Sequence, residues 1–111
     1  MKKLLIAAAL LGASSMAQAD LDILEYCTAQ GGFAERAIKS SQYQTESLTE
    51  SLQRWKDTNS NSDDVEFFKW GNEVILNAYM KPVYNSSKMR KKVIAEYRDE
   101  VTMNCLKSLN Y

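Results

Sequence analysis

The sequence contains no histidine. Histidine is the usual general base near neutral pH and a common ligand of zinc and haem iron, so its absence excludes most such sites and Ser-His or Cys-His catalysis. The sequence also lacks a P-loop, a dinucleotide-binding glycine fingerprint and a G-x-S-x-G motif. We therefore expect no catalytic residue, no metal site and no cofactor, and we interpret the chain as a protein that is not an enzyme.

Residues that interrupt helices are scarce, with one proline and four glycines, and no alternating run reaches the length of a strand. Apolar residues instead recur every three or four positions, which is typical of amphipathic helices. The expected helices cover about 20–41, 45–57, 62–81 and 85–109, with 40–44 as the first connection. Pro82 should end the third helix, because the residue before a proline is disfavoured in helical geometry.

Capping residues precede the later helices. The expected caps are Thr45 or Ser47 for the second helix (Ser47 has capping-box spacing to Glu50), Ser62 for the third, and Asn85 or Ser86 for the last. The pair Gly31-Gly32 is predicted either to kink the first helix or to let a neighbouring backbone approach closely. We predict an all-α fold, a small antiparallel bundle of four helices, or of three if the first two are continuous.

The first nineteen residues have the pattern of a cleaved signal peptide. Lys2 and Lys3 precede an apolar run over 4–11, and Ala17 and Ala19 occupy the two small-residue positions of a cleavage site. The run is shorter than the roughly 18 to 20 residues that span a bilayer, and no later segment reaches that length. We expect 1–19 to be removed and 20–111 to form a single helical domain, periplasmic or secreted, without a transmembrane segment.

The sequence contains only two cysteines, Cys27 and Cys105. In an exported small protein an even count predicts a disulfide, although two separate buried thiols are an alternative. The closed loop would hold almost the whole domain, for which the chain-entropy relation gives about 4–5 kcal/mol. In an antiparallel bundle the start of the first helix lies beside the end of the last, so this pairing agrees with the topology.

Acidic and basic side chains are nearly equal in number. Removing Lys2 and Lys3 with the signal leaves twelve basic and fourteen acidic side chains, a net charge of −2. Domains that bind nucleic acid are usually strongly basic, so we expect no nucleic-acid partner.

One local cluster runs against the helix dipole. Lys88, Arg90, Lys91 and Lys92 fall in the first turns of the last helix, where positive charge is unfavourable. The turn before them contains aromatic residues around the proline. We interpret this segment as a candidate protein-binding surface, formed by Tyr79, Pro82, Tyr84, Lys88, Arg90 and Lys91. The alternative is a solvated helix face opposite the acidic start of the third helix, with the tyrosines covering the end of the bundle.

Three stretches carry a resemblance to known proteins. Cys27, the stretch ILNAYMKP over 75–82 and Cys105 resemble small exported two-cysteine helical proteins of proteobacteria and their phages, in which an Ala-Tyr-x-x-Pro turn precedes the last helix. This resemblance implies a fold and a location but no activity. The design is also similar to the HdeA class of acid-activated periplasmic chaperones, although their cysteines lie closer together in the chain and no residue matches individually.

The sequence therefore favours a non-catalytic exported protein that binds another protein in the periplasm or cell envelope. One alternative is an acid- or stress-activated holdase chaperone, and another is a carrier of a small hydrophobic ligand. The identity of the partner and the oligomeric state are left open.

Overall fold

The computed structural model describes residues 12–111, with side chains from Asp22 onward. Most of the predicted signal peptide (1–11) lies outside the described residues, so its removal stays a prediction. The described chain forms four helices, α2 (Gly12–Tyr43), α3 (Leu48–Thr58), α4 (Val65–Met80) and α5 (Ser87–Ser108). Within this part of the chain, no helix combines the length and the apolar character needed to cross a bilayer.

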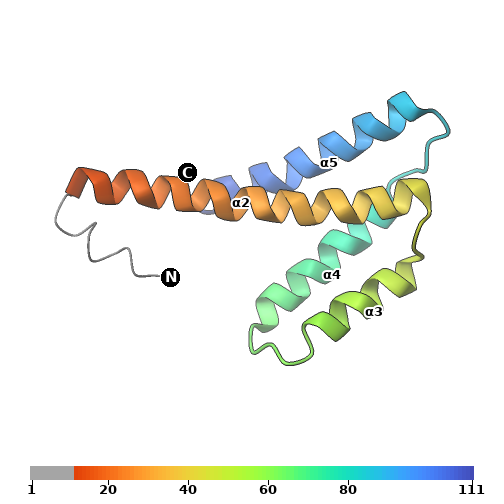
Figure 1. The fold of residues 1–111 in the computed structure, drawn as a ribbon, viewed down its shortest axis with the longest axis horizontal. Helices are drawn as coiled ribbons and strands as arrows, with labels where there is room; N and C mark the ends of the chain where they lie inside the picture. The colour runs from red at the N-terminus through yellow and green to blue at the C-terminus, as the bar shows by residue number, and fades with distance from the viewer. Residues whose placement is uncertain (1–11) are drawn as a thin grey trace.

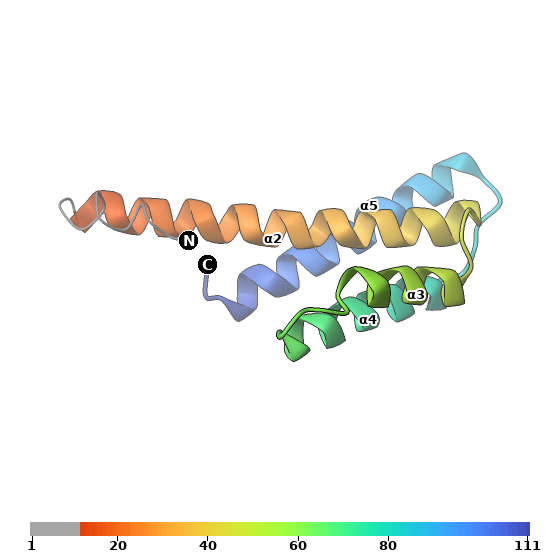
Figure 2. The same ribbon diagram turned by 60° about the horizontal axis from the view of Figure 1, so that its bottom comes forward.

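The helices alternate in direction and form a small antiparallel bundle, as predicted (Figure 1). The longest helix, α2, packs against α5 and α4, and α3 packs against α4. Turning the molecule shows α3 and α4 together on one side of α2, with α5 crossing behind it (Figure 2). The α2–α3 connection and the α4–α5 turn therefore lie at the same end of the bundle.

The disulfide between Cys27 and Cys105 is confirmed. It joins α2 to the last turns of α5, with the two Cα atoms 5.4 Å apart and 78 positions separating the cysteines in the chain. Cys27 is fully buried and Cys105 nearly so. Such a bond is typical of proteins in oxidising compartments.

Most predicted helix ends are confirmed because local chemistry sets them. Ser47 and Glu50 form the predicted capping box at α3, and Ser86 caps α5. Lys81 is extended, with ψ at 144°, and ends α4 before Pro82.

Three predicted ends were wrong. The first helix begins at Gly12 and continues through the predicted connection to Tyr43. It ends there because Gln44 adopts a left-handed conformation, with φ at 53°. The cap of α4 is Asp64, whose carboxylate accepts from the Phe67 N–H at 2.9 Å, and Ser62 instead accepts from the Asp64 N–H.

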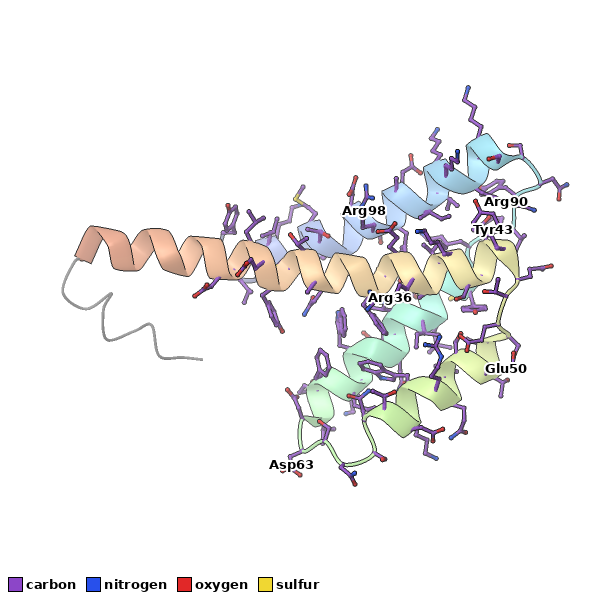
Figure 3. The ribbon with its side chains drawn as sticks, in the orientation of Figure 1. Arg36, Tyr43, Glu50, Asp63, Arg90 and Arg98 are labelled. Carbon is purple, nitrogen blue, oxygen red and sulfur yellow. A yellow bond between two sulfur atoms is a disulfide. The ribbon has the colours of Figure 1, made fainter. Side chains whose placement is uncertain are left out.

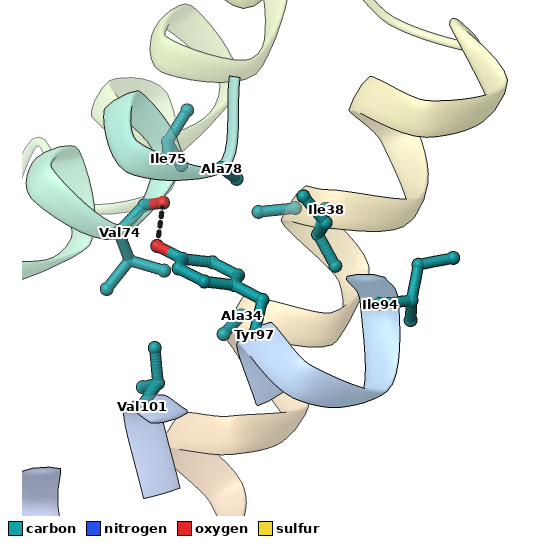
Figure 4. Packing of buried hydrophobic residues seen from close by; sticks show 9 residues of the cluster. Ala34, Ile38, Val74, Ile75, Ala78, Ile94, Tyr97 and Val101 are labelled. Atoms are coloured by element: carbon teal, nitrogen blue, oxygen red, sulfur yellow. Dashed lines mark hydrogen bonds between the residues drawn. The ribbon is translucent and has the colours of Figure 1, made fainter. Parts of the chain in front are cut away.

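The core lies where α2, α4 and α5 meet (Figure 4). Its buried members are Ala34, Ala37, Ile38, Val74, Ile75, Ala78, Ile94, Tyr97 and Val101. Tyr97 is the one polar side chain among them, and its hydroxyl donates a 2.6 Å hydrogen bond to the Val74 carbonyl. Burial, together with the Glu100 carboxylate, raises the pKa of Tyr97 to about 12.

Two glycines allow close packing between helices. A Cβ atom at Gly31 would overlap the Thr102 hydroxyl on α5 and lie 3.1 Å from the Arg98 carbonyl oxygen. Of the two predicted roles for the Gly31-Gly32 pair, close approach is therefore the one observed. A Cβ atom at Gly71 would overlap the indole ring of Trp55, which couples α3 to α4.

Aromatic residues of α3 and α4 form one cluster with Phe33 of α2. Rings from α2, α3 and α4 lie with centroids 4.8 to 6.4 Å apart, the members being Phe33, Trp55, Phe67, Phe68 and Trp70. The Trp55 indole donates to the Phe68 carbonyl at 2.9 Å, which satisfies its single polar group. These contacts hold α3 and α4 together and dock them on α2.

Candidate protein-binding surface at the α4–α5 turn

The predicted surface residues all lie at the end of the bundle where α2 ends and α5 begins. Figure 3 shows Tyr43 and Arg90 side by side at this end, with Asp63 at the opposite end of the α3–α4 hairpin. The acidic start of α4 therefore cannot neutralise the cations at the start of α5. The side chains at this end divide into those that hold the turn and those that face solvent.

Gln42 holds the turn from inside. Its side chain is fully buried, although it lies in a segment expected to be a connection between two helices. The amide nitrogen donates to the Pro82 carbonyl at 2.7 Å, and the amide oxygen accepts from the Tyr84 N–H at 3.1 Å. One side chain of α2 thus satisfies two backbone groups of the α4–α5 turn and fixes its position.

The Tyr79 side chain also forms hydrogen bonds within the molecule. Its hydroxyl donates to the Glu46 carbonyl at 2.7 Å and lies 2.9 Å from the Ser51 hydroxyl, so it ties α4 to the α2–α3 connection. Arg54 binds the Glu46 carboxylate through two nitrogens. The hydrogen bonds from Arg54 and then Ser51 lower the pKa of Glu46 below its usual value.

Arg90 and Tyr84 form a further brace. The Arg90 Nε donates to the Tyr84 carbonyl at 2.7 Å, and its guanidinium carbon lies 5.2 Å from the centre of the Tyr43 ring. Cation–π contacts of this kind are favourable. Of the six residues predicted to form the surface, Tyr79 and Arg90 therefore use their polar side-chain atoms within the molecule. Tyr84 is partly buried.

The remaining cations face solvent. Lys88, Lys91 and Lys92 are exposed and make no ion pair with any described residue. Lys88 lies in the first turn of α5, where the helix dipole opposes positive charge by typically 0.3–1 kcal/mol, and Lys91 and Lys92 lie in the next turn, where this effect has largely fallen off.

Apolar side chains lie next to these lysines in the chain. Met80 is 78 % exposed, Val83 44 % and Met89 37 %. Pro82, between the first two, is also exposed. We define the turn surface by its exposed apolar and basic residues, namely Met80, Pro82, Val83, Lys88, Met89, Lys91 and Lys92.

Sequence reasoning missed Gln42 and the two methionines. The position of Gln42 carries a signal, since Ala34, Ile38 and Gln42 follow one another at four-residue intervals on the buried face of α2. Met80 and Met89 carry none, because methionine occurs equally in cores and on binding surfaces.

Comparisons with protein-family models, with curated proteins and with solved structures find no match for this chain. The resemblance to exported two-cysteine helical proteins stays a prediction.

Proposed function

We propose that this chain is a non-catalytic exported protein that binds another protein in the periplasm or cell envelope through the turn surface. The observation that carries the proposal is the combination of three lysines without ion-pair partners among the described residues and three exposed apolar side chains in the segment 80–92, which includes the braced α4–α5 turn. A partner with carboxylates facing the lysines would offset the unfavourable dipole interaction and cover the apolar residues.

The bracing of the turn supports the proposal. Binding is weakened by the entropy of ordering mobile loops, so a surface already held in place loses less free energy on association. Gln42 and Arg90 fix the backbone of this turn from the interior side. The lysine side chains above it remain free to pair.

A photocrosslinking experiment in the producing cell tests the proposal. A photoreactive amino acid replaces Met89 in the turn surface or, as the matched control, Ser60 in the loop between α3 and α4. We expect a discrete crosslinked partner at Met89 and none at Ser60. Charge reversal by K88E with K91E should remove that product, because the new carboxylates would repel those of the partner. The fold should be unaffected, because both side chains are exposed and make no ion pair with any described residue.

Equal crosslinking at both positions, or capture that survives the charge reversal, would contradict the proposal. The holdase alternative predicts a different result, the exposure of apolar surface near pH 2–3. Strong binding of a hydrophobic dye at that pH, combined with no discrete partner at neutral pH, would favour the holdase and overturn the turn surface as a specific docking site.

A further inference from the structure

A second feature lies away from the turn surface. Figure 1 shows α4 and α5 diverging from their shared turn, and α2 packs against both of them. The space they leave is an open cleft of about 360 Å³ beside the disulfide. Small-molecule sites in proteins commonly measure about 300–1,000 Å³, so the cleft has the size of a site for a small ligand.

The floor of the cleft is apolar. Val74 and Val101 line it with Cys105, and each of the three is less than a tenth exposed. Two aromatic side chains also line the cleft, Tyr26 from α2 and Trp70 from α4. Tyr26 is 51 % exposed, and so it presents ring surface to the solvent in the cleft.

The charge of the cleft has one sign. Among the described residues that line it, the charged ones are Glu73 from α4 and Glu100 from α5. Glu73 makes no ion pair with any described residue. The remaining polar lining groups are uncharged.

A contact within the protein shows that an ammonium group fits beside residues that line the cleft. The Lys81 ammonium lies 3.7 Å from a Glu100 oxygen and 5.4 Å from the centre of the Tyr97 ring. A cation of the protein itself thus lies close to a carboxylate and to an aromatic ring that both line the cleft. The other carboxylate, Glu73, lies on the same helix as Trp70 and has no such partner.

We infer that this cleft binds a small organic cation with an aromatic or alkyl body. The body would lie on the Val74 and Val101 floor between Tyr26 and Trp70, with its ammonium group facing Glu73. Contact with the apolar floor would contribute to the affinity, and the carboxylate together with the aromatic faces would select the positive charge. The site shares no residue with the turn surface, so the inference goes beyond the proposed function and stands or fails separately.

Three probes with the same aromatic body test the charge preference, namely phenethylammonium, phenethyl alcohol and phenylacetate. Each is titrated into the purified protein labelled with ¹⁵N, and the indole N–H signals are followed. We expect saturable movement of the Trp70 signal, with Trp55 little affected because it does not line the cleft. The ammonium should bind at least about threefold more tightly than the alcohol, and the carboxylate most weakly, as expected for partly exposed ion pairs.

Charge-removing variants locate the effect. E73Q should weaken phenethylammonium about two- to fivefold. E96Q, an equally conservative change at an exposed position of α5 outside the cleft, should leave it unchanged. The inference is overturned by equal affinity for the alcohol and the ammonium, by equal effects of the two variants, or by a Trp70 signal that does not move. K88E with K91E should not affect this titration, which separates its outcome from that of the protein-binding proposal.

Discussion

Replacing Gln42 by methionine tests the role assigned to the buried amide. The two side chains have similar length and volume, so Q42M keeps the packing of α2 and removes only the polar atoms. The Pro82 carbonyl loses its donor at 2.7 Å, and the Tyr84 N–H loses its acceptor at 3.1 Å.

The expected loss is about 2–4 kcal/mol. A buried backbone group left without a partner costs about 1–3 kcal/mol. Two groups are affected, but Pro82 and Val83 are exposed and water can reach part of the turn, so the lower half of that range applies to each. For a domain of this size the corresponding fall in Tm is roughly 4–8 °C per kcal/mol.

Urea unfolding followed by far-UV circular dichroism measures this loss, with the m-value expected to stay constant. Amide hydrogen exchange at Tyr84 reports the turn directly and should accelerate in Q42M. The matched control is Q53M, since Gln53 is exposed and bonds only to Asp57. A loss below about 0.5 kcal/mol, the usual range for surface changes, together with an unchanged Tyr84 amide, would refute the reasoning.

Three further predictions concern the bundle. G31A should destabilise it by about 1–3 kcal/mol, because the added methyl meets Thr102, whereas G32A should stabilise it by up to about 1 kcal/mol, because its methyl meets only the end of Arg36 at 3.9 Å and alanine favours helix. If urea unfolding shows that G31A and G32A change the free energy of unfolding in the same direction, the close contact between Gly31 and α5 would be contradicted. Reducing the disulfide should cost about 4–5 kcal/mol, given the 78-position separation, and an unchanged urea midpoint with and without reductant would contradict this. Between pH 10 and about 12 stability should fall, because the raised pKa of Tyr97 means that the folded state keeps a proton that the unfolded state loses. Tyrosinate absorbance should show one of the six tyrosines titrating late, and Y97F should remove that step.

The candidate site was only partly predictable. The basic residues at the start of α5 follow from the sequence, because charge order along a helix and its dipole are local properties. Which of the candidate residues bond within the molecule and which face solvent does not follow from the sequence. Arg90 bonds to the Tyr84 carbonyl and lies over Tyr43, and Tyr79 bonds to Glu46 across 33 positions, and neither contact has a counterpart in residue spacing.

The sequence by itself determined the helical class, the stop before Pro82 and the pairing of its only two cysteines, and it narrowed two helix caps to Thr45 or Ser47 and to Asn85 or Ser86. Each depends on backbone chemistry within a few residues or on there being one choice of partner. The tertiary structure alone decided that α2 continues to Tyr43 with Gln42 inside, because burial against the α4–α5 turn outweighs the polar character of that segment. It also decided that α4 and α5 diverge into a cleft, since the angle between helices follows from side-chain packing and not from the periodicity of either helix.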